Sequence, residues 1–235
     1  MSQLPLYLSA PHACSYRPGQ AARSAFLDPR LSFSRAQRQA LAEAGFRRSG
    51  AAHYRPACQH CQACESVRVD VAAFQANRQQ RRCWRDNQDL VGSWSPALDA
   101  DERYQLYREY LSARHADGEM DPDDRRGFAS FLCDGHRSGA EHLLLRESGG
   151  RLVAVGVVDR LPGAYSAVYT FFDPALATRS LGRYMVLRLI TECREAGLPW
   201  LYLGYHIADC HKMSYKSEYR PQQRHIAGRW QTPGD

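Results

Sequence analysis

The chain has 235 residues, 44% of them hydrophobic, which is enough to bury a core as one large domain or two small ones. No apolar run reaches the length of a membrane span, and the first residues lack the basic flank and apolar core of a signal peptide. The formal net charge of +6 is compatible with a nucleic-acid partner but does not require one.

Cysteine usage indicates the compartment. The sequence holds eight cysteines without a secretion signal. Such a chain is expected in a reducing compartment, where cysteines serve as thiols or metal ligands rather than as disulfides. We therefore expect a cytoplasmic protein with no membrane association.

The first part of the chain predicts two helices and a strand. Residues 34–44 are expected to form a helix that Gly45 ends. Residues 66–71 alternate apolar and polar side chains, as a half-buried strand does. Residues 77–91 are expected to form a second helix, with arginines crowded into its first half.

Two further helices are predicted before the pattern changes. Residues 101–116 are amphipathic and begin with acidic side chains, which are favourable at a helix N-terminus. Residues 125–133 are expected to form another helix. From residue 142 onward the sequence becomes rich in short apolar runs, which indicate strands.

The second part predicts four strands and one long helix. Residues 143–146 and 152–159 are expected to pair as a hairpin around Gly149 and Gly150. A third strand, a long amphipathic helix and a fourth strand follow, at residues 165–172, 180–196 and 199–205.

The stretch 201–216, LYLGYHIADCHKMSYK, changes abruptly from apolar to polar. On a helix, Lys212 and Lys216 would share one face, and the two like charges would repel. An external anion is the simplest reason to tolerate them. Tyr202 and Tyr205 are three residues apart, so in a regular strand they face opposite sides and at most one can reach a cleft.

The cysteine run has metal-like spacing. Cys58, Cys61 and Cys64 are each separated by two residues, which lets neighbouring thiolates point at one ion. Zinc or an iron–sulfur cluster would accept such ligands. Three cysteines in seven residues are rarely needed for packing alone, although reduced packed thiols are the alternative.

Arginines form two clusters on either side of this run. Arg78, Arg81, Arg82 and Arg85 share one face of the predicted helix. A second set consists of Arg47, Arg48 and Arg55. A solvated basic face is the usual meaning of such clusters. The functional alternative is contact with nucleic-acid phosphates or a fork for an acidic side chain, and the position of the two clusters around the cysteine run favours it.

Several blocks of the sequence, in the same order, resemble the aminoacyl-tRNA–protein transferases, the arginyl- and leucyl-transferases that extend acidic protein N-termini. The resemblance covers nearly the whole chain, and its short length and three-cysteine run are similar to the bacterial, leucine-transferring branch. The matching blocks are CSYRPG at 14–19, GFRRSG at 45–50, YRPACQHCQAC at 54–64, SVRV at 66–69, VGVVDRLP at 155–162, VYTFFDP at 168–174, SLG at 180–182 and the 201–216 stretch.

The resemblance implies an α+β fold with the mixed sheet and flanking helices of the acyl-CoA N-acyltransferase (GNAT-like) core. A smaller cysteine-containing region at 1–95 would precede a transferase region at 96–235. In that core two strands splay apart and the donor lies beside a helix N-terminus, here at Ser180 and Gly182. The glycine-rich loop expected for acetyl-CoA is absent, so the 3′ end of a charged tRNA is the favoured donor.

The resemblance also implies a fourth thiol ligand, Cys14. Eukaryotic members carry Cys-x-x-Cys where this chain has Cys14 and Arg17, so its ligand set must differ from theirs. The transfer chemistry itself needs no cofactor, because the aminoacyl ester is already activated. Zinc or an iron–sulfur cluster would serve a structural purpose.

The expected activity is transfer of leucine from leucyl-tRNA to proteins with an N-terminal Asp or Glu, which marks them for degradation. Arginyl transfer is the alternative donor, a non-catalytic metal-stapled RNA-binding module is the alternative class, and a CoA-dependent acetyltransferase is a weaker third choice. No DNA partner is expected. The candidate catalytic residues are Tyr205, Lys212, Lys216 and Asp173. The candidate tRNA- or acceptor-binding residues are Arg47, Arg48, Arg55, Arg78, Arg81, Arg82, Ser180 and Gly182.

Overall fold

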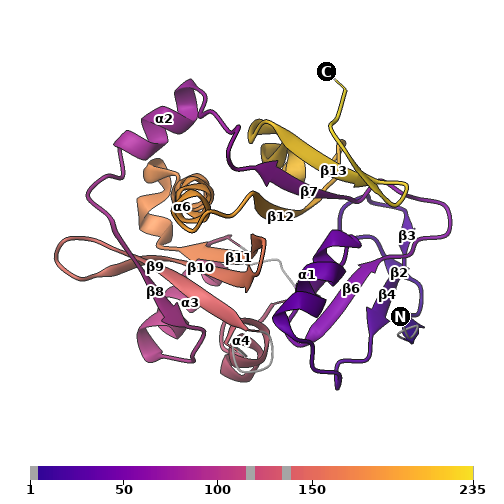
Figure 1. Cartoon of the computed structure of the whole chain (residues 1–235). Helices are drawn as coiled ribbons and strands as arrows, with labels where there is room; N and C mark the ends of the chain where they lie inside the picture. The colour runs from indigo at the N-terminus through magenta and orange to yellow at the C-terminus, as the bar shows by residue number, and fades with distance from the viewer. Residues whose placement is uncertain (1–4, 115–119, 134–138, 235) are drawn as a thin grey trace.

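A mixed sheet of eight strands organises the chain in this computed structural model, which describes residues 5–114, 120–133 and 139–234 (Figure 1). The strand order is β14-β13-β7-β12-β11-β10-β9-β8. The strands are β7 (Glu65–Asp70), β8 (Val91–Pro96), β9 (Ala140–Arg146), β10 (Leu152–Leu161), β11 (Ala164–Phe172), β12 (Trp200–His206), β13 (Gln222–Ile226) and β14 (Arg229–Gln231).

Helices cover both faces of this sheet (Figure 1). On one face, α6 (Leu181–Glu195) buries its apolar side against β9, β10 and β12, and α2 (Arg78–Arg85) packs beside α6. On the other face, α3 (Asp101–Arg114) and α4 (Arg125–Leu132) bury residues against β9, β10 and β11. The strands β9 and β10 are buried on both sides, which explains their continuous apolar sequence.

The strands β11 and β12 are parallel neighbours only at their beginning. They pair from Ala164 to Ser166 and from Trp200 to Tyr202, and then part. Beyond this point the residues of β11 from 167 to 170 are partly exposed, as expected for an unpaired strand edge. The other edge of β12 is occupied by β7 in antiparallel pairing as far as His206.

The regular alternation of β12 is interrupted beside this opening. Its register with β7 shifts between Tyr202 and Gly204, and Gly204 has a φ of 82°, which residues other than glycine rarely adopt. The bulge turns Tyr202 and Tyr205 to the same side, where the Arg47 guanidinium carbon lies 5.0 and 5.8 Å from their ring centroids. The prediction that these tyrosines face opposite sides is therefore wrong.

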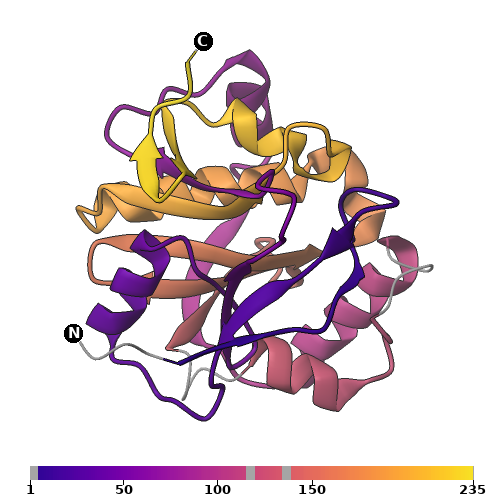
Figure 2. The ribbon, with the colours of Figure 1, turned by 90° about the vertical axis from the view of Figure 1, so that its right-hand side faces the viewer.

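A second, four-stranded sheet lies beside the large one (Figure 2). Its order is β1-β4-β6-β5, and a separate pair, β2-β3, precedes β4 in the chain. These strands are β1 (Leu6–Leu8), β2 (His12–Ala13), β3 (Ala21–Ala22), β4 (Ser24–Leu27), β5 (Arg47–Ser49) and β6 (Ala52–Pro56).

The helix α1 (Arg35–Glu43) leads from β4 to β5. Ser34 caps it, since its side chain accepts from the Gln37 backbone while the Gln37 side chain accepts from the Ser34 backbone. A buried ion pair between Arg48 of β5 and Asp159 of β10 joins the small sheet to the large one at 2.8 Å.

Most of the predicted elements are present. The α+β class, the mixed sheet with flanking helices, and the order of three strands, a long helix and a fourth strand are confirmed, and the fourth strand pairs in parallel with the third. The helix predicted at 77–91 is too long: α2 ends at Arg85, and hydrogen-bonded turns lead to the edge strand β8 at Val91. Of the helix predicted at 101–116, residues 115 and 116 lie outside the described residues.

The segment after β12 forms two short turns of helix, α7 (His211–Ser214) and the 3₁₀ helix η2 (Tyr215–Glu218). The division of the chain at residue 95 stays a prediction, and β7 and β8 from its first part pair within the large sheet. In the described ranges no helix combines the length and hydrophobicity needed to cross a membrane.

Candidate functional site

A pocket of about 660 Å³ lies between the two sheets. The small sheet contributes residues of β1, β4 and β6, and the large sheet contributes residues of β7, β12 and β13. Among its lining residues are all four cysteines of the predicted metal site, together with Tyr16, Arg17, Gly45, Arg55, Glu65, Ser66, Tyr205 and His225.

Lys216 is a buried cation next to the bulge in β12. Lys216 is only 6% exposed. Its Nζ donates to the Tyr205 carbonyl at 2.6 Å and contacts Met213 Sδ at 3.1 Å. Burial, reinforced by the positive charge of Arg47, lowers the pKa of Lys216 to about 8. The ammonium lies beside Gly204 and Tyr205, just past the point where β11 stops pairing with β12.

Lys212 does not share a face with Lys216. It is exposed on α7, whereas Lys216 points into the protein from η2. The 3₁₀ geometry brings residues three apart, not four apart, into line, so the helical spacing assumed for the pair does not hold. Lys212 therefore remains a candidate for surface contact with tRNA phosphate, while Lys216 belongs to the interior.

The Tyr205 hydroxyl is committed to the backbone. It lies 3.0 Å from the Gly45 carbonyl oxygen and 3.3 Å from that of Tyr54, and can donate to either. Burial raises the pKa of Tyr205 well above its usual value. Tyr205 thereby fastens β12 to the small sheet, and its catalytic role stays a prediction.

Asp173 is likewise satisfied within the fold. One carboxylate oxygen accepts from the Ala175 backbone at 2.9 Å, and the other pairs with Arg151 at 2.6 Å. This arrangement starts the 3₁₀ helix η1 (Pro174–Arg179). The carboxylate serves here as a turn residue, as the Asp-Pro sequence predicts, and its contact with the acceptor's ammonium stays a prediction.

The arginines of the small sheet have three different environments. Arg48 is paired with the Asp159 carboxylate and also donates to the Gly50 carbonyl. Arg55 lines the pocket, with its guanidinium carbon 4.9 Å from the Phe46 ring centroid. Arg47 is buried without contacting a carboxylate in the described part of the chain, and its Nε has no hydrogen-bond partner there.

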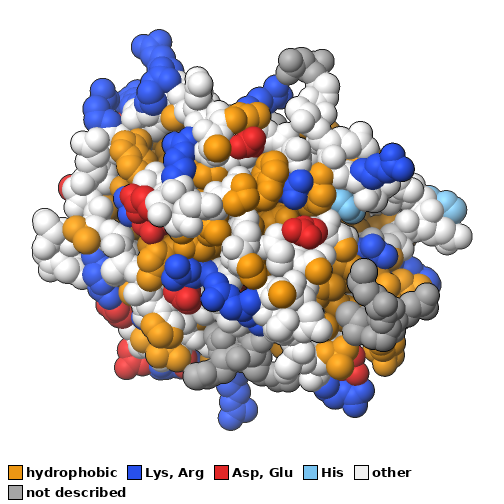
Figure 3. Space-filling view, viewed as in Figure 1, with side chains coloured by type: hydrophobic (Ala, Val, Ile, Leu, Met, Phe, Trp, Pro, Cys, Tyr) orange, Lys and Arg blue, Asp and Glu red, His pale blue; other side chains and the backbone are white. Residues whose placement is uncertain are grey.

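The arginines of α2 are exposed and do not line the pocket. Arg82 pairs with Asp86 at 3.5 Å and Arg81 donates to the Ala76 carbonyl, while Arg78 is on the surface. In the space-filling view, basic side chains gather at the α2 corner of the molecule, although others are spread over the same face (Figure 3). Their contact with tRNA stays a prediction.

The start of α6 lies close to α2. Asn87 donates to the Arg179 carbonyl at 2.9 Å, which joins the loop after α2 to the turn before α6. Ser180 has a left-handed backbone with φ of 54° and makes no side-chain cap. A Cβ atom on Gly182 would lie 3.3 Å from the Phe172 ring, so glycine keeps the first turn of α6 open on that side.

The four cysteines of the predicted metal site border one pocket as free thiols. Burial, and the nearby Cys58, Cys14 and Cys61, raise the pKa of Cys64 to about 11. Arg17 Nη1 donates to Cys61 Sγ at 3.4 Å. Within the described residues no three His, Cys, Asp or Glu side chains are arranged to hold a metal ion, so the metal site stays a prediction.

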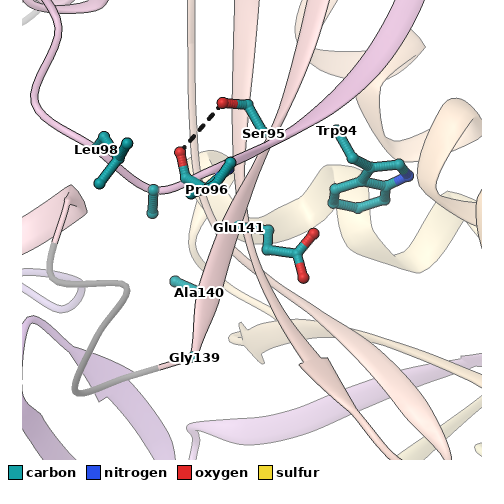
Figure 4. A pocket seen from close by; sticks show the side chains of 8 residues that line it. Trp94, Ser95, Pro96, Leu98, Gly139, Ala140 and Glu141 are labelled. Atoms are coloured by element: carbon teal, nitrogen blue, oxygen red, sulfur yellow. Dashed lines mark hydrogen bonds between the residues drawn. The ribbon is translucent and has the colours of Figure 1, made fainter.

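A second pocket, of about 390 Å³, lies beside β8 and β9 (Figure 4). Trp94, Pro96 and Glu141 are among its lining residues. Its one carboxylate, Glu141, pairs with Arg160 at 3.0 Å. None of the candidate site residues lines it, so the pocket between the sheets is the stronger candidate.

Sequence reasoning missed some residues of the site. Arg17 forms an ion pair with Asp209, which ties the N-terminal loop to the segment after β12. Glu65 of β7 pairs with Arg224 at 3.1 Å at the pocket wall. The unusual Arg17 next to a cysteine motif was the available signal. No local pattern links residues so far apart in the chain.

Comparisons with known proteins identify similar sequences along nearly the whole chain. Two family models match: the C terminus of arginine-tRNA-protein transferase at residues 102–226 and its N terminus at residues 12–82. An aspartate/glutamate leucyltransferase from Teredinibacter turnerae is 44% identical over 230 residues, covering 98% of this chain and 94% of that relative. One from Pseudomonas aeruginosa is 46% identical over 232 residues, covering 98% and 97%.

Solved structures show more distant likenesses. FemX has a TM-score of 0.49 at 11% identity, covering 95% of this chain and 89% of that one. The C-terminal domain of a putative lysylphosphatidylglycerol synthetase from Agrobacterium fabrum has a TM-score of 0.46 at 17% identity, covering 72% and 51%.

Proposed function

The chain belongs to the arginine-tRNA-protein transferase family, and we propose that it transfers leucine from leucyl-tRNA to the N-terminal Asp or Glu of acceptor proteins. The observation that carries the proposal is the similarity to aspartate/glutamate leucyltransferases along 98% of the chain. The product would be a leucine-led protein marked for degradation.

The reaction is aminolysis of an ester. The neutral α-amine attacks the leucyl carbonyl, a C–N bond forms, and the C–O bond to the tRNA ribose breaks. The amine's surplus proton ends on the ribose hydroxyl. Because an α-ammonium has a pKa of about 8, its deprotonation needs little help, and the protein's contribution is alignment and stabilisation of the developing oxyanion.

Lys216 is the group best placed for the oxyanion. It is the buried ammonium where β11 and β12 part, and its pKa of about 8 keeps it mostly protonated at neutral pH. A cation in a site shielded from water stabilises developing negative charge more strongly than one in solvent. Its hydrogen bond to the Tyr205 carbonyl holds it in place.

The donor would approach from the α6 side. The first backbone N–H groups of α6 have no acceptor within the helix, and the open turn at Ser180 and Gly182 leaves room for a phosphate or ribose. The exposed arginines of α2 and Lys212 are our candidates for contacts with the tRNA backbone. The acceptor would then enter from the opposite side, through the pocket between the sheets.

The cysteines would have a structural purpose. We propose that Cys14, Cys58, Cys61 and Cys64 hold zinc or an iron–sulfur cluster that fixes the N-terminal region. The support is their position around one pocket, together with the chemistry of four thiols. Ligation would need the sulfurs to draw closer than they are here.

Arginyl transfer is the alternative, since the matching family models carry that name. The test supplies purified leucyl-tRNA or arginyl-tRNA with a Glu-led peptide, and mass spectrometry then weighs the peptide. A gain of leucine only is expected. A gain of arginine only would move the enzyme to the other donor, and no gain from either tRNA would overturn the proposed function.

A further inference from the structure

Arg47 is a buried cation that contacts no carboxylate in the described part of the chain. It is 7% exposed on β5, where Nη1 donates to the Phe46 carbonyl at 3.1 Å and Nη2 donates to Ser66 Oγ. Nε has no partner in the described part of the chain. The next residue, Arg48, is equally buried but has Asp159 as a partner with two contacts of 2.9 Å.

An unpaired buried charge is costly. Removing a guanidinium from water is strongly unfavourable, and two neutral hydrogen bonds replace only part of its hydration. The rings of Tyr202 and Tyr205 offset some of this through cation–π contacts. Burial still lowers the pKa of Arg47. A fold that keeps such a charge is suited to an anion that arrives from outside.

The surroundings of Arg47 connect it with the pocket. Ser66, which accepts from Arg47, and Tyr205, whose ring faces it, both line the pocket between the sheets. Glu65, the acidic residue of that lining, is already paired with Arg224. A carboxylate that enters the pocket would therefore meet an electropositive wall at Ser66 and Tyr205.

The size of the pocket favours a peptide end over a nucleic acid. A volume of about 660 Å³ accommodates one or two amino-acid residues, whereas tRNA phosphates are contacted along open, exposed surfaces. Tyr205 also links Arg47 to the proposed reacting centre, because its carbonyl accepts from Lys216. An acceptor side chain held at Arg47 would thus place its α-amine near Lys216.

We infer that Arg47 is the specificity-determining residue for the acceptor: from behind Ser66 and Tyr205, which line the pocket between the sheets, it binds the side-chain carboxylate of the N-terminal Asp or Glu. This inference rests on the proposed function. The sequence predicted that arginines of either cluster could bind the acidic side chain of the acceptor, and the inference assigns this contact to Arg47 alone. Arg48 and the arginines of α2 have no part in it.

The test compares acceptors that differ only in charge. Leucyl transfer to a Glu-led and a Gln-led peptide is measured for the wild type and for Arg47→Lys and Arg47→Gln. Loss of a charge-assisted hydrogen bond corresponds to about tenfold or more in kcat/KM. We expect Arg47→Gln to lose at least tenfold for the Glu-led peptide, with little change for the Gln-led one. Arg47→Lys should retain part of the preference.

Arg48→Lys is the matched control. It changes the neighbouring residue in the same way and disturbs an ion pair, so it should lower thermal stability while keeping the Glu-over-Gln preference. The KM for leucyl-tRNA should be unchanged in all folded variants, as judged by circular dichroism. If Arg47→Gln does not fold, Arg47→Lys, which keeps a cation at this position, still allows the test.

Two results would overturn the inference. One is an Arg47 variant that keeps the full Glu-over-Gln preference. The other is an effect confined to the KM for leucyl-tRNA, which would assign Arg47 to phosphate binding instead. A wild type that transfers no leucine to either peptide would contradict the proposed function, which is a separate failure.

Discussion

The Arg17 guanidinium donates two hydrogen bonds to the Asp209 carboxylate, from Nε at 2.9 Å and from Nη2 at 2.6 Å, and so joins positions 192 residues apart. The same guanidinium donates to Cys61. The N-terminal loop, the cysteine run and the segment after β12 therefore meet at one side chain, in a place where eukaryotic relatives are expected to carry a cysteine.

This contact predicts a coupled loss. Arg17→Ala and Asp209→Ala should each loosen the N-terminal loop, and the double variant should be little worse than either, because both remove one interaction. The pair is exposed, so the effect should fade with added salt. Hydrogen exchange of residues 12–22 measures it. Additive increases in exchange would mean that the two side chains act independently.

The thiols predict a metal-dependent stability. Protein purified without oxygen or chelator should contain one zinc ion or one iron–sulfur cluster, and a chelator should lower its melting temperature. Cys61→Ser should give the same loss and make the chelator ineffective. Cys193→Ser is the control, since Cys193 is a residue of α6 that is buried in the core and does not line the pocket. Metal-free protein that is unaffected by chelator would contradict the prediction.

Lys216 predicts opposite changes in stability and activity. Its pKa is depressed to about 8 from 10.5, so below pH 8 the folded state carries a charge that burial opposes. Lys216→Met should raise the free energy of unfolding at pH 7 by about 1–3 kcal/mol, because an apolar side chain of similar length replaces it. Its kcat should fall roughly 100-fold if the ammonium stabilises the oxyanion.

Denaturant unfolding and single-turnover kinetics check these two effects. In the wild type, the free energy of unfolding should gain a contribution from Lys216 as pH rises from 8 to 10.5. In that window the unfolded chain binds more protons than the folded one. Lys216→Met should lack this increase. Full activity in Lys216→Met would remove Lys216 from the reacting centre.

Two buried histidines predict acid sensitivity. His142 Nε2 donates to the Leu132 carbonyl at 3.0 Å, while Nδ1 accepts from Arg103 at 3.0 Å, so the ring is neutral. Burial lowers the pKa of His142, and of His53, to about 4. Between pH 6.5 and 4 the unfolded chain binds more protons than the folded one, so stability is lost as pH falls.

The loss expected from His142 is about 3 kcal/mol, complete near pH 4. Unfolding curves in urea at pH 7, 5.5 and 4 measure it. His142→Gln should start less stable and lose less over this range. An identical pH dependence in wild type and His142→Gln would show that other groups control the acid transition.

The local patterns of the sequence predicted the centre of the fold but not its edges. The apolar runs at β9 to β12 and the amphipathic α6 are strong periodic signals, and the structure contains them. The addition of β7 and β13 to the far edge of β12 depends on pairing between distant segments, which no local pattern encodes. The short strands of the small sheet were missed for the same reason.

The candidate site was predicted less well because side-chain direction depends on backbone irregularities. The bulge at Gly204 reversed the expected alternation of Tyr205, and the 3₁₀ turn separated Lys216 from Lys212. Arg47 stands out because its buried Nε has no hydrogen-bond partner in the described part of the chain. A sequence can show that an arginine is present, but only the fold shows whether an acid reaches it.

The most direct test of the account is the position of the added leucine. Wild-type enzyme, purified leucyl-tRNA and a Glu-led peptide are incubated together, and tandem mass spectrometry locates the modification, with an N-acetylated copy of the peptide as control. We predict one leucyl residue on the α-amine of the Glu-led peptide and none on the acetylated copy. Unmodified Glu-led peptide, or leucine on a side chain, would contradict the account.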